Sequence, residues 1–174
     1  YPHVTHFIDG DRDIELKYTT KISVPRKEVE TYDLKPEMSA EEVTEKIKYL
    51  IDDYDFVIVN YANGDMVGHT GNYNAAIKAV ECVDNCIRDL YELSFQKDIL
   101  LIITADHGNC EEMLDKNNKP HTYHTTNKVP LIVCDKKYSV EDGKLSDIAP
   151  SILNILKLEI PKEMTGNIII KDKN

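Results

Sequence analysis

The sequence is short of cations and has no long apolar run. Lys and Arg number 21 against 31 Asp and Glu, which gives the 174-residue chain a formal net charge of −10. Nucleic acids and anionic lipid surfaces are bound by clustered cations, so this balance argues against nucleic acid or a membrane as a partner. The apolar runs fall far below the roughly 18 residues of a membrane-spanning helix. The longest are Phe56–Val59, Ile99–Ile103 and Val129–Cys134.

Cysteine is sparse too, and the four thiols show neither a CxxC pair nor the spacing of a zinc finger. Cys82 and Cys86 lie four residues apart in a helical pattern, but small buried thiols in a reducing compartment explain all the cysteines. The chain opens with Tyr1-Pro2-His3, without Met and without a basic and then apolar leader. We therefore expect a cytoplasmic protein, and either a fragment or a chain whose original N-terminus has been removed.

Short runs rich in Val and Ile predict strands that are buried on both faces, as in a parallel sheet. They are Tyr54–Tyr61, Asp98–Ala105 and Val129–Cys134, with Val4–Ile8 as a weaker fourth. Residues 9–36 fit no such pattern and are interpreted as a loop or hairpin. The polar tail from Lys171 to Asn174 is expected to fray. At about 150 residues per domain, the length predicts a single domain.

Helical patterns fill the intervals between these runs. Ser39 and Glu42 form a capping box, which predicts that a helix begins there. Apolar residues at helical spacing predict a second helix over Asn74–Leu93 and a third over Ile148–Leu156, with Pro150 in its first turn. Strands and helices that alternate in this way predict an α/β fold, a layered sheet with right-handed crossovers.

The polar residues of interest lie beside the strand-like runs. Asp65 and His69 follow the first run, Asp106 and His107 follow the second, and His124 precedes the third. Because ligands bind at the carboxyl ends of strands in open α/β sheets, we expect the two Asp–His pairs at one edge of the sheet, with His124 as an additional ligand. Carboxylate oxygen with neutral imidazole is a ligand set for Mn, Zn or Fe. Two such ions about 4 Å apart are a recurrent arrangement for phosphoryl transfer.

Each Asp–His pair alone has a simpler explanation, a hydrogen-bonded pair on the surface. The DxxxH spacing of Asp65 and His69 also arises often by chance. The concentration of histidine favours the metal interpretation, because four of the 6 histidines lie in three short segments beside the strand-like runs. These four are His69, His107, His121 and His124.

Several longer motifs resemble one known family. They are Thr31–Ala40 (TYDLKPEMSA), Asn60–Gly71 (NYANGDMVGHTG), Thr104–Asn109 (TADHGN) and His124–Pro130 (HTTNKVP). In this order they resemble the cofactor-independent phosphoglycerate mutases of the alkaline-phosphatase superfamily. The resemblance covers nearly the whole chain. It implies a three-layer α/β/α fold with a mostly parallel sheet, alkaline-phosphatase-like and incomplete here. It also implies that residues 1–174 are the C-terminal portion of the metal-binding phosphatase-type domain.

The resemblance implies a role for each candidate ligand. Asp65, His69 and His124 would hold one ion, and Asp106 and His107 would contribute to a second. The family uses two manganese ions, with zinc, cobalt or magnesium as alternatives, and interconverts 3-phosphoglycerate and 2-phosphoglycerate in glycolysis. A metal-activated serine takes the phosphoryl group and returns it to the neighbouring hydroxyl of the bound glycerate.

Other parts of the family's machinery lie upstream of the region that this chain resembles. They are the nucleophilic serine, an aspartate ligand, an inserted phosphotransferase domain and, just ahead of the position of Tyr1, a catalytic lysine. No serine of this chain stands in the nucleophile's context, so no catalytic residue is assigned among Ser23, Ser39, Ser94, Ser139, Ser146 and Ser151. We expect no mutase turnover from the isolated chain. We expect the full-length protein to be a monomer and the fragment to self-associate through an open sheet edge.

Two alternatives stay open at the level of sequence. Another metalloenzyme of the superfamily (a phosphopentomutase, phosphodiesterase or sulfatase) shares the DxxxH and Asp-His-Gly patterns but not the segment YDLKPEMSA. A stand-alone metal-binding module without chemistry is the second alternative. Cys110 stands where the family has an Ala-like residue, and we interpret it as a small packed residue rather than an oxidation-sensitive thiol.

Overall fold

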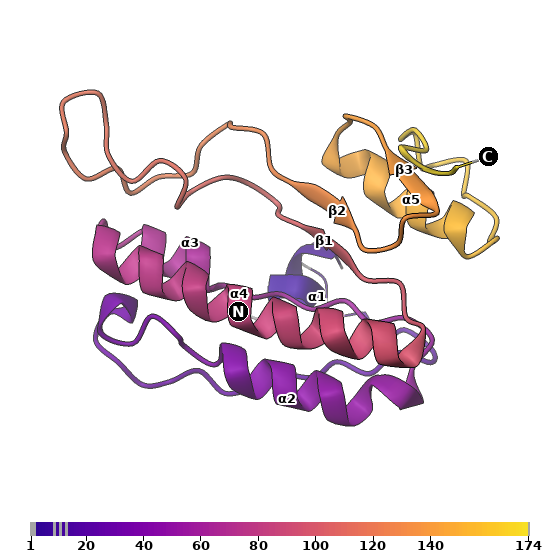
Figure 1. The fold of residues 1–174 in the computed structure, drawn as a ribbon, viewed down its shortest axis with the longest axis horizontal. Coiled ribbons are helices and arrows are strands. Elements are labelled where there is room, and N and C mark those ends of the chain that lie inside the picture. Colours follow the sequence, from indigo (N-terminus) through magenta and orange to yellow (C-terminus); the bar gives the residue numbers. More distant parts are fainter. Residues whose placement is uncertain (1–2, 9, 11, 13, 174) are drawn as a thin grey trace. The chain divides into compact units, whose positions relative to one another are not determined.

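The computed structural model describes residues 3–8, 10, 12 and 14–173 and divides into two compact units (Figure 1). Unit 1 holds Tyr1–Leu93 and Gly108–Thr126, and unit 2 holds Ser94–His107 and Asn127–Asn174. Within the described ranges, none of the helices combines the length and the apolar character needed to cross a bilayer.

Unit 1 is built from helices and loops in the part of the chain that the structure describes. Its elements are α1 (His3–Ile8), η1 (Tyr32–Leu34), α2 (Ala40–Leu50), η2 (Ile51–Asp53), α3 (Asn63–Gly68) and most of α4 (Tyr73–Lys97). Figure 1 shows α4 as the longest helix. Lys48 of α2 forms an ion pair with Asp89 of α4, with the nitrogen 3.4 Å from the carboxylate oxygen.

A small core fixes α3 against α4. It consists of the buried side chains Val67, Ala75, Ala76, Ala79 and Met113, with Tyr32, Met38 and Cys110 packed around them. The side chains that α4 contributes are all alanines, so small methyl groups fill this side of the core. Val67 has no exposed surface. In the sequence it lies between Asp65, which is on α3, and His69, which caps the C-terminal end of α3. Packing of Val67 therefore also sets the positions of these two polar residues.

Unit 2 combines two antiparallel strand pairs with one α-helix. In the first pair, β1 (Ile102–Thr104) lies beside β2 (Leu131–Val133), with Ile103 opposite Ile132. In the second, β3 (Tyr138–Val140) lies beside β4 (Ile170–Asp172), with Ser139 opposite Lys171. The helix α5 (Ile148–Ile155) follows the 3-10 helix η3 (Leu145–Asp147) and contacts β4.

The helices match the sequence predictions closely. α2 begins directly after Ser39, α4 covers Asn74–Leu93 and continues to Lys97, and α5 ends one residue before the predicted Leu156. The prediction of a capping-box hydrogen bond from Ser39 is wrong, however. The Ser39 hydroxyl donates to the Pro25 carbonyl at 2.8 Å instead, so it ties the helix start to the preceding loop.

The strands depart further from the predictions, although the α/β class is confirmed. Asp98–Ala105 and Val129–Cys134 keep three residues each as strand, and they pair antiparallel rather than parallel. Tyr54–Tyr61 forms no ladder among the described residues, and its Phe56 and Ile58 are 51% and 50% exposed. A strand exists only where a neighbour completes its backbone hydrogen bonds, so an apolar run without such a neighbour stays extended chain.

Both ends of the chain also differ from prediction. Val4–Ile8 lies in the helix α1 rather than in a strand. Lys171 and Asp172 belong to β4 instead of a frayed tail, because β3 supplies their partners, while Asn174 lies outside the described residues. The loop interpretation of residues 9–36 is confirmed over residues 14–31, where the structure has neither helix nor strand, but Tyr32–Leu34 forms the short 3-10 helix η1. Residues 9, 11 and 13 lie outside the described residues.

Candidate metal centre

Helix α3 places Asp65 and His69 one turn apart. The backbone N–H of His69 donates to the Asp65 carbonyl at 3.1 Å. Residues four apart share one face of a helix, so the two side chains can reach one point. The buried amide of Asn63 anchors the start of this helix, since its Nδ2 donates to the carbonyls of Pro36 and Glu37, both at 2.8 Å.

The loop that carries His124 is tied to the same part of unit 1. The N–H of Thr125 donates to the Gly108 carbonyl at 2.9 Å, and the N–H of His121 donates to the Met113 carbonyl at 2.9 Å. Met113 belongs to the core that holds α3. Two segments 55 residues apart in the sequence are thereby brought together.

Three ligand atoms converge within unit 1. Oδ1 of Asp65 lies 2.9 Å from Nε2 of His124 and 3.1 Å from Nε2 of His69, and the two Nε2 atoms are 3.1 Å apart. Adjacent ligands of an octahedral ion with bonds of about 2.1 Å are roughly 3 Å apart, so this spacing suits one divalent ion. All three side chains remain partly exposed, which leaves the ion a path from solvent.

The hydrogen bonding of His69 shows which of its ring nitrogens is available. Nδ1 lies 2.7 Å from the Thr122 carbonyl oxygen, which can only accept, so Nδ1 carries the ring proton. Nε2 of the neutral ring is then a lone-pair donor to a cation, and it faces the carboxylate of Asp65. Metal-binding histidines usually donate their other N–H to a carbonyl or carboxylate. Nε2 of His69 and the carboxylate of Asp65 present lone pairs to each other, so a cation fits between them.

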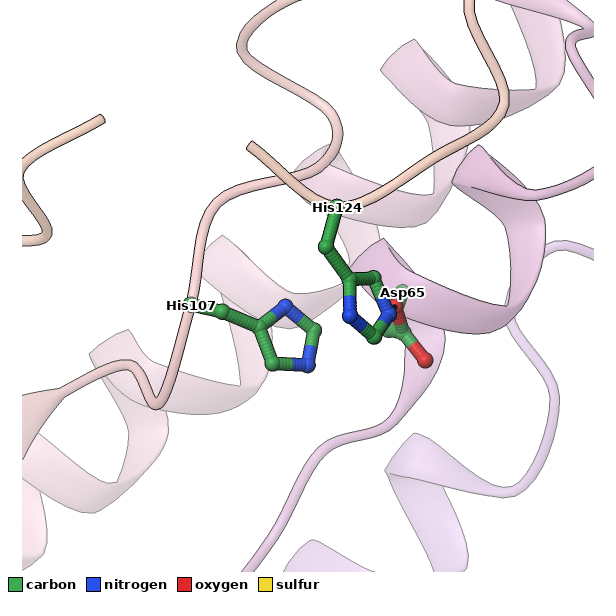
Figure 2. A group of neighbouring side chains, drawn as sticks. All are labelled: Asp65, His107 and His124. Atoms are coloured by element: carbon green, nitrogen blue, oxygen red, sulfur yellow. Dashed lines mark ion pairs between the residues drawn. The ribbon is translucent and has the colours of Figure 1, made fainter. Parts of the chain in front are cut away.

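Figure 2 draws Asp65, His107 and His124, and the side chains of Asp65 and His124, both of unit 1, lie together in it. His107 ends the first segment of unit 2, and its peptide bond to Gly108 connects it to unit 1, where Gly108 is hydrogen-bonded to Thr125. The three converging atoms within unit 1 define the candidate centre.

Asp106 belongs to unit 2 and is not one of the three residues that converge within unit 1. Its side chain is 71% exposed, and its carboxylate contacts its own neighbour, accepting from the His107 backbone N–H at 3.1 Å and lying 3.5 Å from His107 Nε2. Of the five residues singled out from the sequence, the structure gathers Asp65, His69 and His124 most tightly.

Sequence reasoning did not single out Asn109, which lies beside the centre. Its Nδ2 donates to Oδ1 of Asp65 at 2.8 Å, and the residue is only 5% exposed. The one available hint is its place directly after the Asp-His-Gly turn. The contact spans 44 residues, so no local pattern reveals it.

Cys110 packs beside the centre without joining it. Its thiol donates to the Gly64 carbonyl at 2.7 Å. Burial raises the pKa of this thiol, and the nearby charges of Asp65 and Glu111 raise it as well. A thiol that holds its proton is a poor metal ligand, which agrees with the interpretation of Cys110 as a packing residue.

Comparisons with known proteins find a metalloenzyme family and phosphoglycerate mutases to which this chain is similar. The sequence model of the Metalloenzyme superfamily matches residues 1–160. Over 98% of its length, the chain is 49% identical to the 2,3-bisphosphoglycerate-independent phosphoglycerate mutase of Onion yellows phytoplasma and 50% identical to that of Hahella chejuensis. It covers 34% of each of these relatives, so it spans about a third of their length.

A solved structure is similar throughout the chain. It is a Leishmania mexicana phosphoglycerate mutase, a crystal structure at low cobalt concentration, with 31% sequence identity and a TM-score of 0.86. The match covers 98% of this chain and 35% of that one. The similarity confirms the alkaline-phosphatase-like fold expected from the sequence motifs, as part of a larger protein.

Proposed function

Because the chain belongs to the Metalloenzyme superfamily, we propose that it forms the metal-binding part of a cofactor-independent phosphoglycerate mutase. The convergence of Asp65, His69 and His124 on one point carries this proposal. Two mutases about half identical to the chain support the choice of substrate, 3-phosphoglycerate and 2-phosphoglycerate. Since the chain spans about a third of these relatives, the activity is proposed for the whole protein.

The ligands are proposed residue by residue. Asp65, His69 and His124 hold one divalent ion, and Asp106 and His107 contribute to a second ion together with groups from the rest of the protein. The exposed carboxylate of Asp106 supports this second role, because it is accessible to a further ligand set. Manganese is proposed as the physiological ion, since carboxylate and imidazole suit it, with zinc, cobalt or magnesium as alternatives.

The chain's own residues would position the chemistry. When bound, the ion polarises a phosphoryl oxygen and activates a hydroxyl nucleophile. His69 keeps one ring orientation because its Nδ1–H is bound to the Thr122 carbonyl. Asp65 supplies negative charge against the ion. The serine nucleophile and the catalytic lysine are proposed to lie in the remainder of the protein, with residues 1–174 as the C-terminal portion of the phosphatase-type domain.

Three further properties are proposed for the whole protein. It acts in glycolysis, in the cytoplasm and as a monomer, as the resemblance to the mutase family implies. The net charge of −10 supports a small-molecule substrate over nucleic acid as its partner.

The test is a mutase assay on the whole protein that contains this chain, stripped with a chelator and reloaded with Mn²⁺. We expect activity only with the ion, and we expect His124→Asn to lower kcat/KM by more than about 100-fold, beyond the range typical of residues behind the ligands. His121→Asn is the matched control, since His121 lies on the same loop and binds the Glu112 carbonyl instead. Full activity of His124→Asn, or hydrolysis of phosphodiesters or sulfate esters without mutase turnover, would contradict the proposal.

A further inference from the structure

The buried amide of Asn109 binds the same carboxylate oxygen that faces the histidines. Nδ2 of Asn109 donates to Oδ1 of Asp65 at 2.8 Å and lies 3.3 Å from the Asp65 backbone carbonyl. A carboxylate oxygen carries two lone pairs. The amide N–H occupies one of them, and the other is left to face Nε2 of His69 and of His124.

The orientation of this amide is fixed by its surroundings. Exchanging its oxygen and nitrogen would place the oxygen against two acceptors of Asp65, so the nitrogen must be the atom on that side. Oδ1 of Asn109 then has no hydrogen-bond partner among the described residues, although it is fully buried. It lies against Gly68, where an added Cβ would overlap this oxygen. A buried acceptor without a partner lowers the stability of the folded chain, so its presence here needs an explanation other than stability.

The backbone of Asn109 is held just as firmly. Its N–H donates to Oε2 of Glu111 at 2.6 Å, and the other carboxylate oxygen of Glu111 accepts from the Thr125 hydroxyl. Thr125 directly follows His124. The carboxylate of Glu111 therefore links the segment that carries Asn109 to the loop that carries His124. The side chain of Asn109 links the same segment to α3.

We propose that Asn109 is a positioning residue of the metal centre, which holds the carboxylate of Asp65 with one lone pair aimed at the ion. This inference rests on the proposed metal site. The proposed role explains why Oδ1 of Asn109 is buried without a partner, because Nδ2 of the same amide has to face the carboxylate of Asp65. Partners behind metal ligands fix ligand orientation, and their loss typically costs about 10- to 100-fold in metal affinity.

The experiment is a Co²⁺ titration of the 174-residue chain, followed by the visible absorption bands of the bound ion. Asn109→Ala removes the amide, and Asn109→Leu keeps its bulk without the N–H. We expect both variants to bind Co²⁺ about 10- to 100-fold more weakly and to show altered bands. Thr44→Ala is the matched control, because Thr44 is a buried polar side chain on α2 whose hydroxyl binds the Ala40 carbonyl and the Tyr61 hydroxyl rather than a candidate ligand. It should lower stability and leave the cobalt bands unchanged.

The outcomes separate this inference from the proposed function. No cobalt binding by the unaltered chain would overturn the proposed metal site, and the inference with it. Binding by both Asn109 variants with unchanged affinity and bands would overturn the inference alone. If neither variant folds, Gly68→Ala decides, because it pushes on the amide from the opposite side and keeps its chemistry. Bands identical to those of the unaltered chain in Gly68→Ala would then overturn the inference, and shifted bands would support it.

Discussion

Thr122 contributes to the candidate centre through its backbone rather than its side chain. Its carbonyl accepts the Nδ1–H of His69 and so selects the ring nitrogen that faces Asp65. Motifs show which side chains have the chemistry of metal ligands, and Asp65, His69 and His124 are candidates on that ground. They do not show which carbonyl or amide orients those side chains, so Thr122 and Asn109 become visible only in three dimensions.

A prediction at the residue scale concerns Cys110. Burial, followed by the charges of Asp65 and Glu111, raises the pKa of its thiol, so less thiolate is present at any pH near neutrality than in a free cysteine. We expect iodoacetamide to alkylate Cys110 more slowly than it alkylates glutathione at the same pH, with the rate rising as the pH rises. Peptide mass spectrometry over time measures this rate. Alkylation at or above the rate of glutathione would contradict the account.

At the scale of elements, one hydroxyl joins helix α5 to the end of the chain. Ser151 has no exposed surface, and its Oγ donates to the Asp147 carbonyl at 2.7 Å while accepting from the Ile169 N–H at 2.9 Å. Ile169 lies just before β4 and is itself buried. The hydroxyl therefore supplies a partner for a backbone N–H that water does not reach.

Ser151→Ala should consequently destabilise the chain. The Ile169 N–H would remain buried without its partner, and we expect a loss of about 1–3 kcal/mol in the free energy of unfolding, measured with urea. Ser139→Ala is the control, since the exposed Ser139 hydroxyl makes only a 3.3 Å contact with the Lys171 carbonyl and its loss should stay within about 0.5 kcal/mol. Equal effects of the two substitutions would show that the buried hydroxyl has no special role.

Helices and strands differed in how far the sequence predicted them, for a physical reason. The periodicity of α4 is local, because its hydrogen bonds join residues four apart, and so its position was predictable. The strand Tyr138–Val140 is hydrogen-bonded to Ile170–Asp172, about thirty residues later in the sequence. The sequence of either short run does not indicate which segment it pairs with. Tyr54–Tyr61 has the composition of a strand but lacks a partner strand in the part of the chain that the structure describes.

At the scale of the whole molecule, the chain spans about a third of its mutase relatives, and yet the tightest ligand group lies within one compact unit. Asp65, His69 and His124 belong to unit 1, so the proposed first ion would take these three ligands from one compact unit. Asp106 and His107 close a segment of unit 2, and their proposed ion depends on further ligands. Self-association of the isolated chain stays a prediction.

The most direct test of the account is the position of a bound ion in crystals of the chain soaked with Mn²⁺, measured by anomalous diffraction. The account predicts one strong peak at about 2.0–2.2 Å from Oδ1 of Asp65 and from Nε2 of both His69 and His124. A strong peak elsewhere, or no peak within bonding distance of these three atoms, would contradict it.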